Sequence, residues 1–565
     1  MPEWNYEERE EVNLTTSKER GISKVAEEVG EALSNQQELF AKSNLVYRLN
    51  IDAKQRVELV EEEEFSFMSS LDKYIIPVVI DEKKTKEALE KWSAEVVKNP
   101  SVPRPIPVTK YALNATKSKE LLRSKAMKSK MPEIRAMFDC PMLIEQDGKL
   151  VEIHQYDPVS KIWCRGNPTQ NMSVEEAKEC INTMLQDFHF LTESDRARAI
   201  YSLLTPSIYF SGAMGRHRVP IQVTEANSSQ SGKGYFNQLI QALFNTQIGK
   251  VSFSSSDKGL GSAMESISSV MISGKTFICL DNIRGVINEA KLESLATEDT
   301  FLARKLHADA ELDPRDYYIS MTSNSAAMTK DLANRSNILR IKRQPNGYVY
   351  AKFEEGDLIS HIEANHAKFL GAVYTLIRHW HNLDKPEIRS THNTQTFAKW
   401  AAIGNWFVKE VFGMDLDLLD EYDLIGQRIS SDTLSYLRIC ANMVEYAGLT
   451  MRSFTAHELC TAAVGTADFE EQLGLNADDE HLSDGASRKL AAAFRRPRLV
   501  DGLNNHEQCV MRIEGFHVAQ EAEDTEGKND NSYTRMRYTF YTDQEFKEHF
   551  EPKPRQGQLD IDVPF

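Results

Sequence analysis

The sequence has few of the features that mark low-complexity, secreted or membrane-spanning chains. Glycine (27) and proline (19) are sparse for 565 residues, which argues against long unstructured regions. There is no uninterrupted apolar run of about 18 residues and no N-terminal signal pattern, so we expect a soluble, cytoplasmic protein. The seven cysteines are scattered without Cys-x-x-Cys spacing, which fits a reducing compartment and predicts no zinc site.

Basic charge is also in short supply. Lysine and arginine total 67 against 84 acidic residues, and the formal net charge is −17. This excess disfavours nonspecific nucleic-acid binding over the whole surface. It is still compatible with a ring protein whose central pore alone is basic. The length exceeds that of one domain, and 41% apolar residues are enough for a sizeable core.

The most informative stretch is 219–240, VPIQVTEANSSQSGKGYFNQLI. Pro220–Thr224 is a short apolar strand, and Tyr235–Asn245 has the apolar spacing of a helix. The small-residue loop between them would direct backbone N–H groups at phosphates, aided by the helix N-terminus. Lys233 would then reach the β- and γ-phosphates of a nucleotide. The predicted phosphate-binding residues are Asn227, Ser228, Ser229, Gln230, Ser231, Gly232, Lys233, Gly234 and Tyr235.

Two positions depart from the G-x-x-x-x-G-K-[ST] pattern. Asn227 replaces the first glycine, which is a mild change because asparagine tolerates left-handed backbone angles. Gly234 replaces the hydroxyl residue that would bind Mg²⁺, so one direct metal ligand is missing.

Two further apolar strands end in polar residues downstream. Phe277–Leu280 reads as a strand buried on both faces, and Asp281 follows it where a carboxylate would hold Mg²⁺. Tyr317–Asn324 is a second such strand, and its terminal Asn324 could orient a water molecule. Arg335 precedes the next strand. Because open α/β sheets bind ligands at the carboxyl ends of strands, this order predicts a P-loop ATPase that uses ATP and Mg²⁺.

The same set of motifs resembles the compact AAA+ core of superfamily 3 helicases. It is most similar to the ATPase half of primase–helicase proteins of phages, plasmids and integrated elements. Flanking segments extend the likeness over about residues 35–545, among them FDCPMLIEQDGKLVEIHQYDPVSKIWC at 138–164 and QDFHFLTESDRARAIYSLLTP at 186–206. The resemblance implies DNA as a partner and a ring, by analogy a hexamer, in which Arg335 completes the neighbouring subunit's site. Asn282 stands where many AAA+ proteins have a glutamate, which leaves the general base open.

The interval between the predicted strands Phe277–Leu280 and Tyr317–Asn324 carries Arg304 and Lys305. In superfamily 3 rings it supplies a hairpin that grips single-stranded DNA, so the resemblance makes both residues candidate DNA contacts. An exposed basic pair without that role is the alternative. In the N-terminal half, Lys117–Lys130 is expected to be a solvated amphipathic helix, with DNA contact as the alternative.

The C-terminal part has the rhythm of a winged helix. Thr455–Ala463 would be a short helix, and Asp484–Phe494 a recognition-type helix. Val510–Ile513 and Thr534–Tyr541 are expected to pair as the strands of the wing, and the acidic segment between them would form its tip. DNA binding and protein interaction both stay open for this domain. Its candidate phosphate contacts are Arg488, Lys489, Arg495 and Arg496.

The chain ends in LDIDVPF, which resembles the acidic C-terminal tip of bacterial single-stranded-DNA-binding protein. Such a tip would offer the Phe565 ring and its α-carboxylate to a host protein with an apolar, basic-rimmed pocket. The alternative is an ordinary tail. The candidate partner-binding residues are Asp560, Asp562, Val563, Pro564 and Phe565.

Together these patterns predict an α/β protein with a P-loop AAA+ core of superfamily 3 type. The favoured function is a ring-forming DNA helicase or replication-initiation ATPase of a mobile genetic element. The alternative is a non-translocating AAA+ switch, such as a helicase loader or a defence-system regulator. The expected divisions are an α+β domain (1–165), the ATPase core with its preceding helices (166–345), a helical region (346–447), a winged-helix-like domain (448–545) and a disordered tail (546–565).

Overall fold

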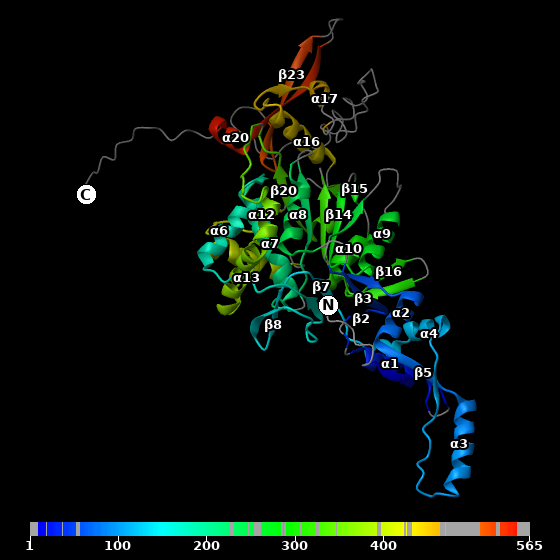
Figure 1. The fold of residues 1–565 in the computed structure, drawn as a ribbon. Coiled ribbons are helices and arrows are strands. Elements are labelled where there is room, and N and C mark those ends of the chain that lie inside the picture. The colour runs from blue at the N-terminus through cyan, green and yellow to red at the C-terminus, as the bar shows by residue number, and fades with distance from the viewer. Residues whose placement is uncertain are drawn as a thin grey trace.

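The computed structural model describes residues 9–17, 20–34, 36, 38–51, 57–215, 217–226, 231–246, 248–252, 261–283, 286–287, 290–305, 308–323, 327–345, 347–392, 397–422, 425, 432–463, 469, 509–526 and 532–550. A six-stranded sheet of order β11-β20-β12-β18-β14-β13 forms its centre (Figure 1). The strands from β20 to β13 run parallel, and β11 pairs antiparallel with β20. Their bounds are β11 His189–Phe190, β12 Ile221–Ala226, β13 Ile248–Ser252, β14 Phe277–Ile283, β18 Tyr318–Ser323 and β20 Ser336–Lys342.

The apolar runs predicted as buried strands form the middle of this sheet. Side chains alternate between its faces, so Phe277 joins one hydrophobic core and Ile278 and Leu280 join the other. Strands covered on both faces need continuous apolar sequence, which explains why these runs lack polar alternation. The mixed α/β class predicted from the sequence is confirmed.

Helices cover both faces of the sheet (Figure 1). The first core packs α8 against α6, α7 and the helices after the sheet, and the second packs α9, α10 and α11. The bounds on the first face are α6 Val174–Leu185, α7 Glu193–Phe210, α8 Lys233–Leu243, α12 Leu358–Ala364, α13 His366–Asn382, α14 Ala398–Trp406 and a π-helix Phe407–Val411. Those on the second are α9 Gly261–Ile272, α10 Ala290–Thr297 and α11 Lys330–Ala333.

The parallel strands give the sheet two distinct edges. The carboxyl edge holds the ends of β12, β14, β18 and β20, and the amino edge holds their beginnings. A hairpin, β16 Phe301–Lys305 and β17 Ala308–Leu312, leads through the 3-10 turn Pro314–Asp316 into β18 at the amino edge. A short parallel pair, β15 Val286–Ile287 and β19 Ala327–Met328, completes this part of the chain.

An N-terminal unit contacts the amino edge. It contains a sheet of order β1-β5-β6 and an antiparallel sheet of order β2-β3-β4. The Tyr47 hydroxyl donates a hydrogen bond to the Ile272 carbonyl of α9, which attaches this unit to the core. Its elements are β1 Glu10–Asn13, α1 Ile22–Ser34, β2 Leu39–Lys42, β3 Leu45–Ile51, β4 Val57–Glu61, α2 Glu64–Tyr74, β5 Ile75–Ile80, α3 Glu82–Val96, β6 Thr109–Tyr111, α4 Ala115–Arg123 and α5 Lys125–Lys128.

The expectation of one solvated helix over Lys117–Lys130 is wrong. The chain leaves the helical conformation at Ser124, whose hydroxyl accepts a hydrogen bond from Met127 N and caps the separate helix α5. Lys128 is buried there and donates to the Asn44 carbonyl at 2.7 Å.

A connecting segment joins this unit to α6. It contains the parallel pair β7 Ala136–Phe138 and β10 Ile162–Cys164, and the hairpin β8 Met142–Gln146 with β9 Lys149–Ile153. Met137 N and the Thr276 hydroxyl, at the start of β14, form a 3.1 Å hydrogen bond that ties the segment to the amino edge.

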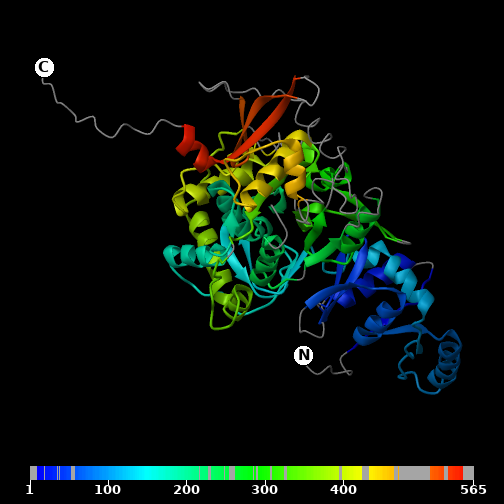
Figure 2. The same cartoon turned by 90° about the horizontal axis from the view of Figure 1, so that it is seen from above.

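A C-terminal unit lies at the opposite end of the molecule from the N-terminal unit (Figures 1 and 2). It has a four-stranded sheet of order β21-β24-β23-β22 with its own core. The predicted wing is wrong in its pairing, because β23 lies between β22 and β24 and includes the first half of the supposed wing tip. The elements are α16 Asp432–Tyr446, β21 Ser453–Phe454, α17 Ala456–Ala463, β22 Cys509–Ile513, β23 Phe516–Glu526, β24 Ser532–Thr542 and α20 Asp543–Phe550.

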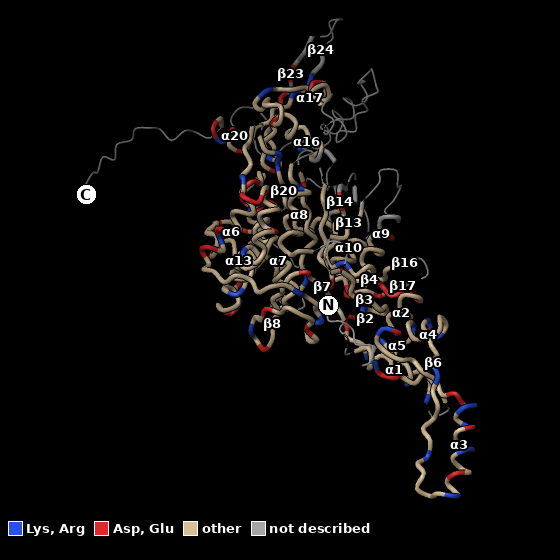
Figure 3. Tube along the Cα trace, in the orientation of Figure 1, with Lys and Arg blue, Asp and Glu red and all other residues tan. Residues whose placement is uncertain are grey.

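Charged side chains of both signs are interspersed along the described chain (Figure 3). Helix α3, which projects from the body, alternates lysine and glutamate and buries none of its residues. Within the described residues, no helix combines the length and the apolar character needed to cross a lipid bilayer.

Candidate active site

The start of α8 has the geometry of an anion-binding helix N-terminus. Gly232 precedes α8 with φ of +95°, in the left-handed region that side-chain-bearing residues avoid. Lys233 is then the first residue of the helix, so its backbone N–H and its charge lie at the positive end of the helix dipole. Ser231 is buried beside them.

The aromatic rings of Phe188 and Phe236 pack beside the start of α8. An ideal Cβ on Gly232 would lie 3.6 Å from the Phe188 ring, which also packs edge-on against Phe236 with ring centroids 5.7 Å apart. Phe188 comes from the segment just before β11. No spacing pattern in the sequence predicts this contact, because the two segments are brought together only by the sheet.

The Tyr235 side chain makes its polar contact on the side of α12. Its hydroxyl accepts a hydrogen bond from Ile359 N at 3.3 Å and lies near Asp357, so it joins α8 to α12. Burial raises the pKa of Tyr235, and the hydroxyl therefore stays protonated. Gly234, by contrast, has open space where a Cβ would be placed.

Asp281 lies at the same carboxyl edge. It is half-buried in β14, and one of its carboxylate oxygens accepts a 2.6 Å hydrogen bond from the Thr322 hydroxyl of β18. Ser323, the next residue of β18, donates to the Ile283 carbonyl at 3.0 Å. Two consecutive residues of β18 therefore form hydrogen bonds with the end of β14. These bonds fix the orientation of the carboxylate.

Helix α8 is attached directly to the strand that carries Asp281. The Asn237 side chain donates to Cys279 Sγ at 3.1 Å in the buried layer between helix and sheet. Burial raises the pKa of the Cys279 thiol to about 11, so the thiol is neutral and has a structural role. This contact holds the start of α8 and the end of β14 in one rigid arrangement.

Arg335 lies on the other edge of the sheet. Its carbonyl accepts a hydrogen bond from Ile221 N, the first residue of β12, at 3.0 Å. The segment predicted to bind phosphates follows the last residue of the same strand in the sequence. The full length of β12 therefore separates Arg335 from Gly232 and Lys233 in one chain.

Arg304 and Lys305 lie at the end of the β16–β17 hairpin, where Lys305 pairs with Ala308. The hairpin expected between the two strands is thus present, and the side chains of these two residues fall outside the described part. The same holds for the Asn282 side chain, whose backbone belongs to β14.

The remaining predicted residues lie wholly outside the described residues. They are Asn227, Ser228, Ser229, Gln230, Asn324, Arg488, Lys489, Arg495, Arg496, Asp560, Asp562, Val563, Pro564 and Phe565.

The residues present fit a nucleotide with Mg²⁺. In the described part, no group of three or more His, Cys, Asp or Glu side chains could hold a metal by itself. Mg²⁺ in nucleotide sites is commonly held by one or two carboxylates together with substrate phosphates. The oriented Asp281 suits that arrangement, and Gly232 and Lys233 would hold the phosphates.

Comparisons with known proteins give little support of their own. No protein-family model matches the chain, and no curated protein sequence does. Among solved structures, a chain described as "SCCmec type IV Cch - active helicase" matches with 10% identity and a TM-score of 0.27, over 89% of this chain and 91% of that chain. Because a likeness at this level carries no argument about function, the proposal below depends on the site itself.

Proposed function

We propose that this protein is a ring-forming, ATP-hydrolysing DNA helicase or replication-initiation ATPase of a mobile genetic element. The observation that carries the proposal is the position of three features on one sheet. A left-handed glycine followed by a helix-starting lysine lies at the carboxyl edge, and an oriented aspartate lies at the same edge. An arginine lies at the opposite, amino edge of the sheet, beside the start of the strand that leads into the loop.

In the proposed mechanism, the loop amides and Lys233 hold the phosphates, and Asp281 holds Mg²⁺. The metal supplies charge neutralisation during phosphoryl transfer. Thr322 keeps the carboxylate of Asp281 oriented through its hydroxyl. Asn324 would position the attacking water, and the general base stays open because Asn282 replaces the usual glutamate.

The position of Arg335 supports an oligomer. An arginine finger must approach the γ-phosphate, and in this chain Arg335 lies at the wrong edge of the sheet to serve its own site. It would serve a neighbouring subunit, which requires a ring such as a hexamer. DNA would pass along the β16–β17 hairpins, with Arg304 and Lys305 as contacts, and the C-terminal unit offers a second candidate DNA or protein surface.

One observation favours a second candidate, a non-translocating switch such as a helicase loader. Gly234 leaves open space where the metal-binding hydroxyl of a P-loop would be. A site with one metal ligand fewer suits slow turnover, in which bound nucleotide controls assembly. The C-terminal LDIDVPF would then recruit a host protein that normally receives the tip of the single-stranded-DNA-binding protein.

The test is ATP turnover with and without single-stranded DNA, measured beside strand displacement on forked DNA. A helicase shows DNA-stimulated turnover and strand displacement, both abolished by Lys233→Ala. Turnover without displacement favours the switch. The absence of ATP binding and turnover under all these conditions contradicts both.

A further inference from the structure

The three central strands of the sheet carry only two charged side chains. The other residues of β12, β18 and β14 are uncharged, and the two exceptions are Asp281 of β14 and Glu225 of β12. Both lie at the carboxyl edge, where the start of α8 would hold the phosphates. Glu225 is buried, with 8% of the residue exposed. Because burial of a carboxylate is costly, we expect Glu225 to have a specific role.

Glu225 and Asp281 belong to opposite faces of the sheet. Side chains alternate along a strand, and Val223, two residues before Glu225, is part of the second core on the side of α9 and α10. Cys279, two residues before Asp281, contacts Asn237 of α8. The two carboxylates therefore flank the strand ends from opposite sides.

Glu225 is the first member of a row that crosses the strands to the end of β14. Its Cα partner on β18 is Ser323, and Ser323 donates to the Ile283 carbonyl of β14 at 3.0 Å. Asn282, which stands where many AAA+ proteins have a glutamate, directly precedes Ile283 in the sequence. Glu225 thus lies two strands away from the usual position of the general base, with Ser323 between them.

The direction of attack favours the face of Glu225. In phosphoryl transfer, the attacking and the leaving oxygens lie roughly in line through the γ-phosphorus. The start of α8 would hold the leaving phosphates, so the water approaches from the side away from α8. Glu225 lies on that side, whereas Asp281 lies on the side of α8, where it would hold Mg²⁺.

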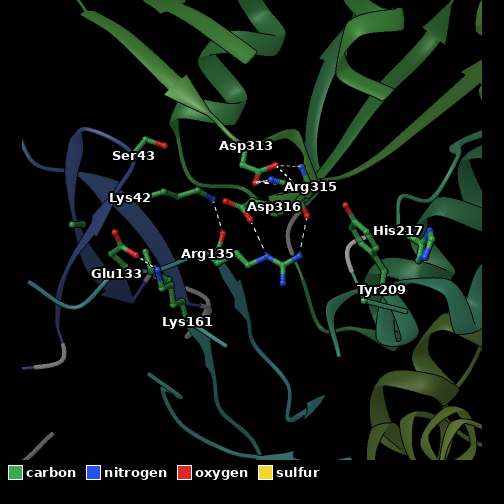
Figure 4. A pocket seen from close by; sticks show the side chains of 13 residues that line it. Lys42, Ser43, Glu133, Arg135, Lys161, Tyr209, His217, Asp313, Arg315 and Asp316 are labelled. Carbon is green, nitrogen blue, oxygen red and sulfur yellow. Dashed lines mark hydrogen bonds and ion pairs between the residues drawn. The ribbon is translucent and has the colours of Figure 1, made fainter. Parts of the chain in front are cut away.

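A second group of acids beside the sheet is too distant for this role. Asp313 and Asp316 line a pocket at the amino edge and pair with Arg315 and Arg135 (Figure 4). The 3-10 turn that contains Asp316 precedes β18, and Ser323 ends this strand. The full length of β18 therefore separates these acids from the carboxyl edge.

We propose that Glu225 is the general base of ATP hydrolysis, an inference that rests on the ATPase function proposed above. Its carboxylate takes a proton from the attacking water while the water oxygen forms a bond to the γ-phosphorus. The bond from the γ-phosphorus to the bridging oxygen breaks, and ADP leaves with the electron pair. The proton then passes from the Glu225 carboxyl group to the released phosphate, which restores the carboxylate.

A purely structural role of Glu225 is the alternative that the test must separate. Arg340 of β20 is the Cα partner of Glu225 on its other side, and it forms ion pairs with Asp195 and Glu514. If Glu225 only supports this cluster, its replacement lowers the stability of the protein and leaves turnover by the folded fraction unchanged. Loss of a general base has the opposite effect.

The test is ATP turnover by the full-length protein, measured beside ATP binding and thermal unfolding. Glu225→Gln keeps the size of the side chain and removes the base. We expect ATP affinity close to that of the wild type and a kcat roughly 100- to 10,000-fold lower, the contribution typical of a general base. The acidic limb of the pH profile of kcat should be present in the wild type and absent from the residual activity of Glu225→Gln.

Two further variants complete the design. Glu225→Asp keeps a carboxylate and withdraws it by one methylene group, so it should retain more turnover than Glu225→Gln together with the acidic limb. It also serves if Glu225→Gln fails to fold. Glu62→Gln is the matched control, because Glu62 is 4% exposed and pairs with Arg48 at 3.0 Å in the N-terminal unit. This control should keep the kcat and the pH profile of the wild type.

Two results would overturn the inference and leave the ATPase function standing. One is a Glu225→Gln protein with the kcat of the wild type. The other is a loss of turnover that matches the loss of folded protein. A wild-type protein that neither binds nor hydrolyses ATP contradicts the proposed function, and the inference about Glu225 falls with it.

Discussion

Thr322 and Asp281 come from neighbouring parallel strands and are joined by a hydrogen bond of 2.6 Å at the carboxyl edge of the sheet. The hydroxyl donates to one carboxylate oxygen and so orients the aspartate. In the proposed function, the other carboxylate oxygen would meet the metal ion, and Thr322 would act on the metal through Asp281.

Thr322→Val keeps the shape of the side chain and removes the hydrogen-bond donor. It should raise the Mg²⁺ concentration needed for half-maximal ATP turnover about 10-fold, which is the lower end of the effect of removing a hydrogen-bond partner from a metal ligand. Asp281→Asn should abolish turnover at any Mg²⁺ concentration. Magnesium titrations of ATPase activity measure both. If Thr322→Val has the wild-type Mg²⁺ requirement, the aspartate does not need this partner.

Gly234 offers a gain-of-ligand experiment. Open space surrounds its missing Cβ, so Gly234→Ser can be accommodated and would supply the hydroxyl that P-loops usually direct at Mg²⁺. We expect a lower Mg²⁺ requirement and faster turnover. Gly232→Ser is the matched control, because its φ of +95° makes any side chain strained and should impair nucleotide binding. An unchanged Mg²⁺ requirement in Gly234→Ser would place the metal elsewhere.

The sequence predicted those parts of the fold that depend on local pattern. The runs around Phe277 and Tyr318 became central strands because both of their faces are covered, and Lys233 begins the predicted helix. Residues that pair across distant segments gave no such signal. The Phe188 ring reaches Gly232 only because β11 is added at the edge of the sheet beside β20. The prediction that β22 and β24 pair with each other is wrong because a third strand, β23, lies between them and pairs with both.

Arg340 is a second position that the sequence did not single out. It is buried in β20 and pairs with Asp195 of α7 at 2.9 Å and with Glu514 of the C-terminal unit at 3.1 Å. Arg340→Met would leave Asp195 with Arg198 alone, at 3.2 Å, and Glu514 with only the more distant Arg438, at 3.9 Å. Removal of one partner from a buried ion pair typically costs about 3–5 kcal/mol. Thermal unfolding should show a large loss of stability, with release of the C-terminal unit as judged by limited proteolysis.

The control is Arg512→Met. Arg512 also pairs with two acids, Glu421 at 3.5 Å and Asp543 at 3.2 Å, and its side chain is 48% exposed. Exposed pairs contribute about 0–1 kcal/mol, so this variant should unfold near the wild-type temperature. Equal effects of the two substitutions would show that burial of the Arg340 pairs has no special weight.

Lys42 gives a pH-dependent prediction. Its pKa is lowered by burial from 10.5 to about 8, so the unfolded chain binds more protons than the folded one between these values. Stability from this group therefore rises with pH through that window and is lowest below about pH 8. Lys42→Met should be more stable than the wild type at pH 7, by at most about 3 kcal/mol. The advantage should shrink as the pH approaches 10. An advantage that stays constant with pH would mean that Lys42 is not a buried cation.

The central claim is that each active site is completed by Arg335 of a neighbouring subunit. Arg335→Ala should bind ATP normally and lose turnover on the order of a thousandfold, whereas Lys233→Ala should bind ATP roughly 10- to 100-fold more weakly. At an ATP concentration below the weakened Kd of Lys233→Ala, each protein alone should therefore show little turnover. In a mixed ring, a subunit with intact Lys233 can receive the intact Arg335 of a Lys233→Ala neighbour, which rebuilds a complete site.

The most direct measurement is therefore ATP turnover by mixtures of Lys233→Ala and Arg335→Ala protein at constant total concentration. The account predicts that activity appears on mixing, is highest at intermediate ratios and coincides with an oligomer in sedimentation. If no ratio restores turnover and the protein sediments as a monomer with ATP, the shared-site account is contradicted.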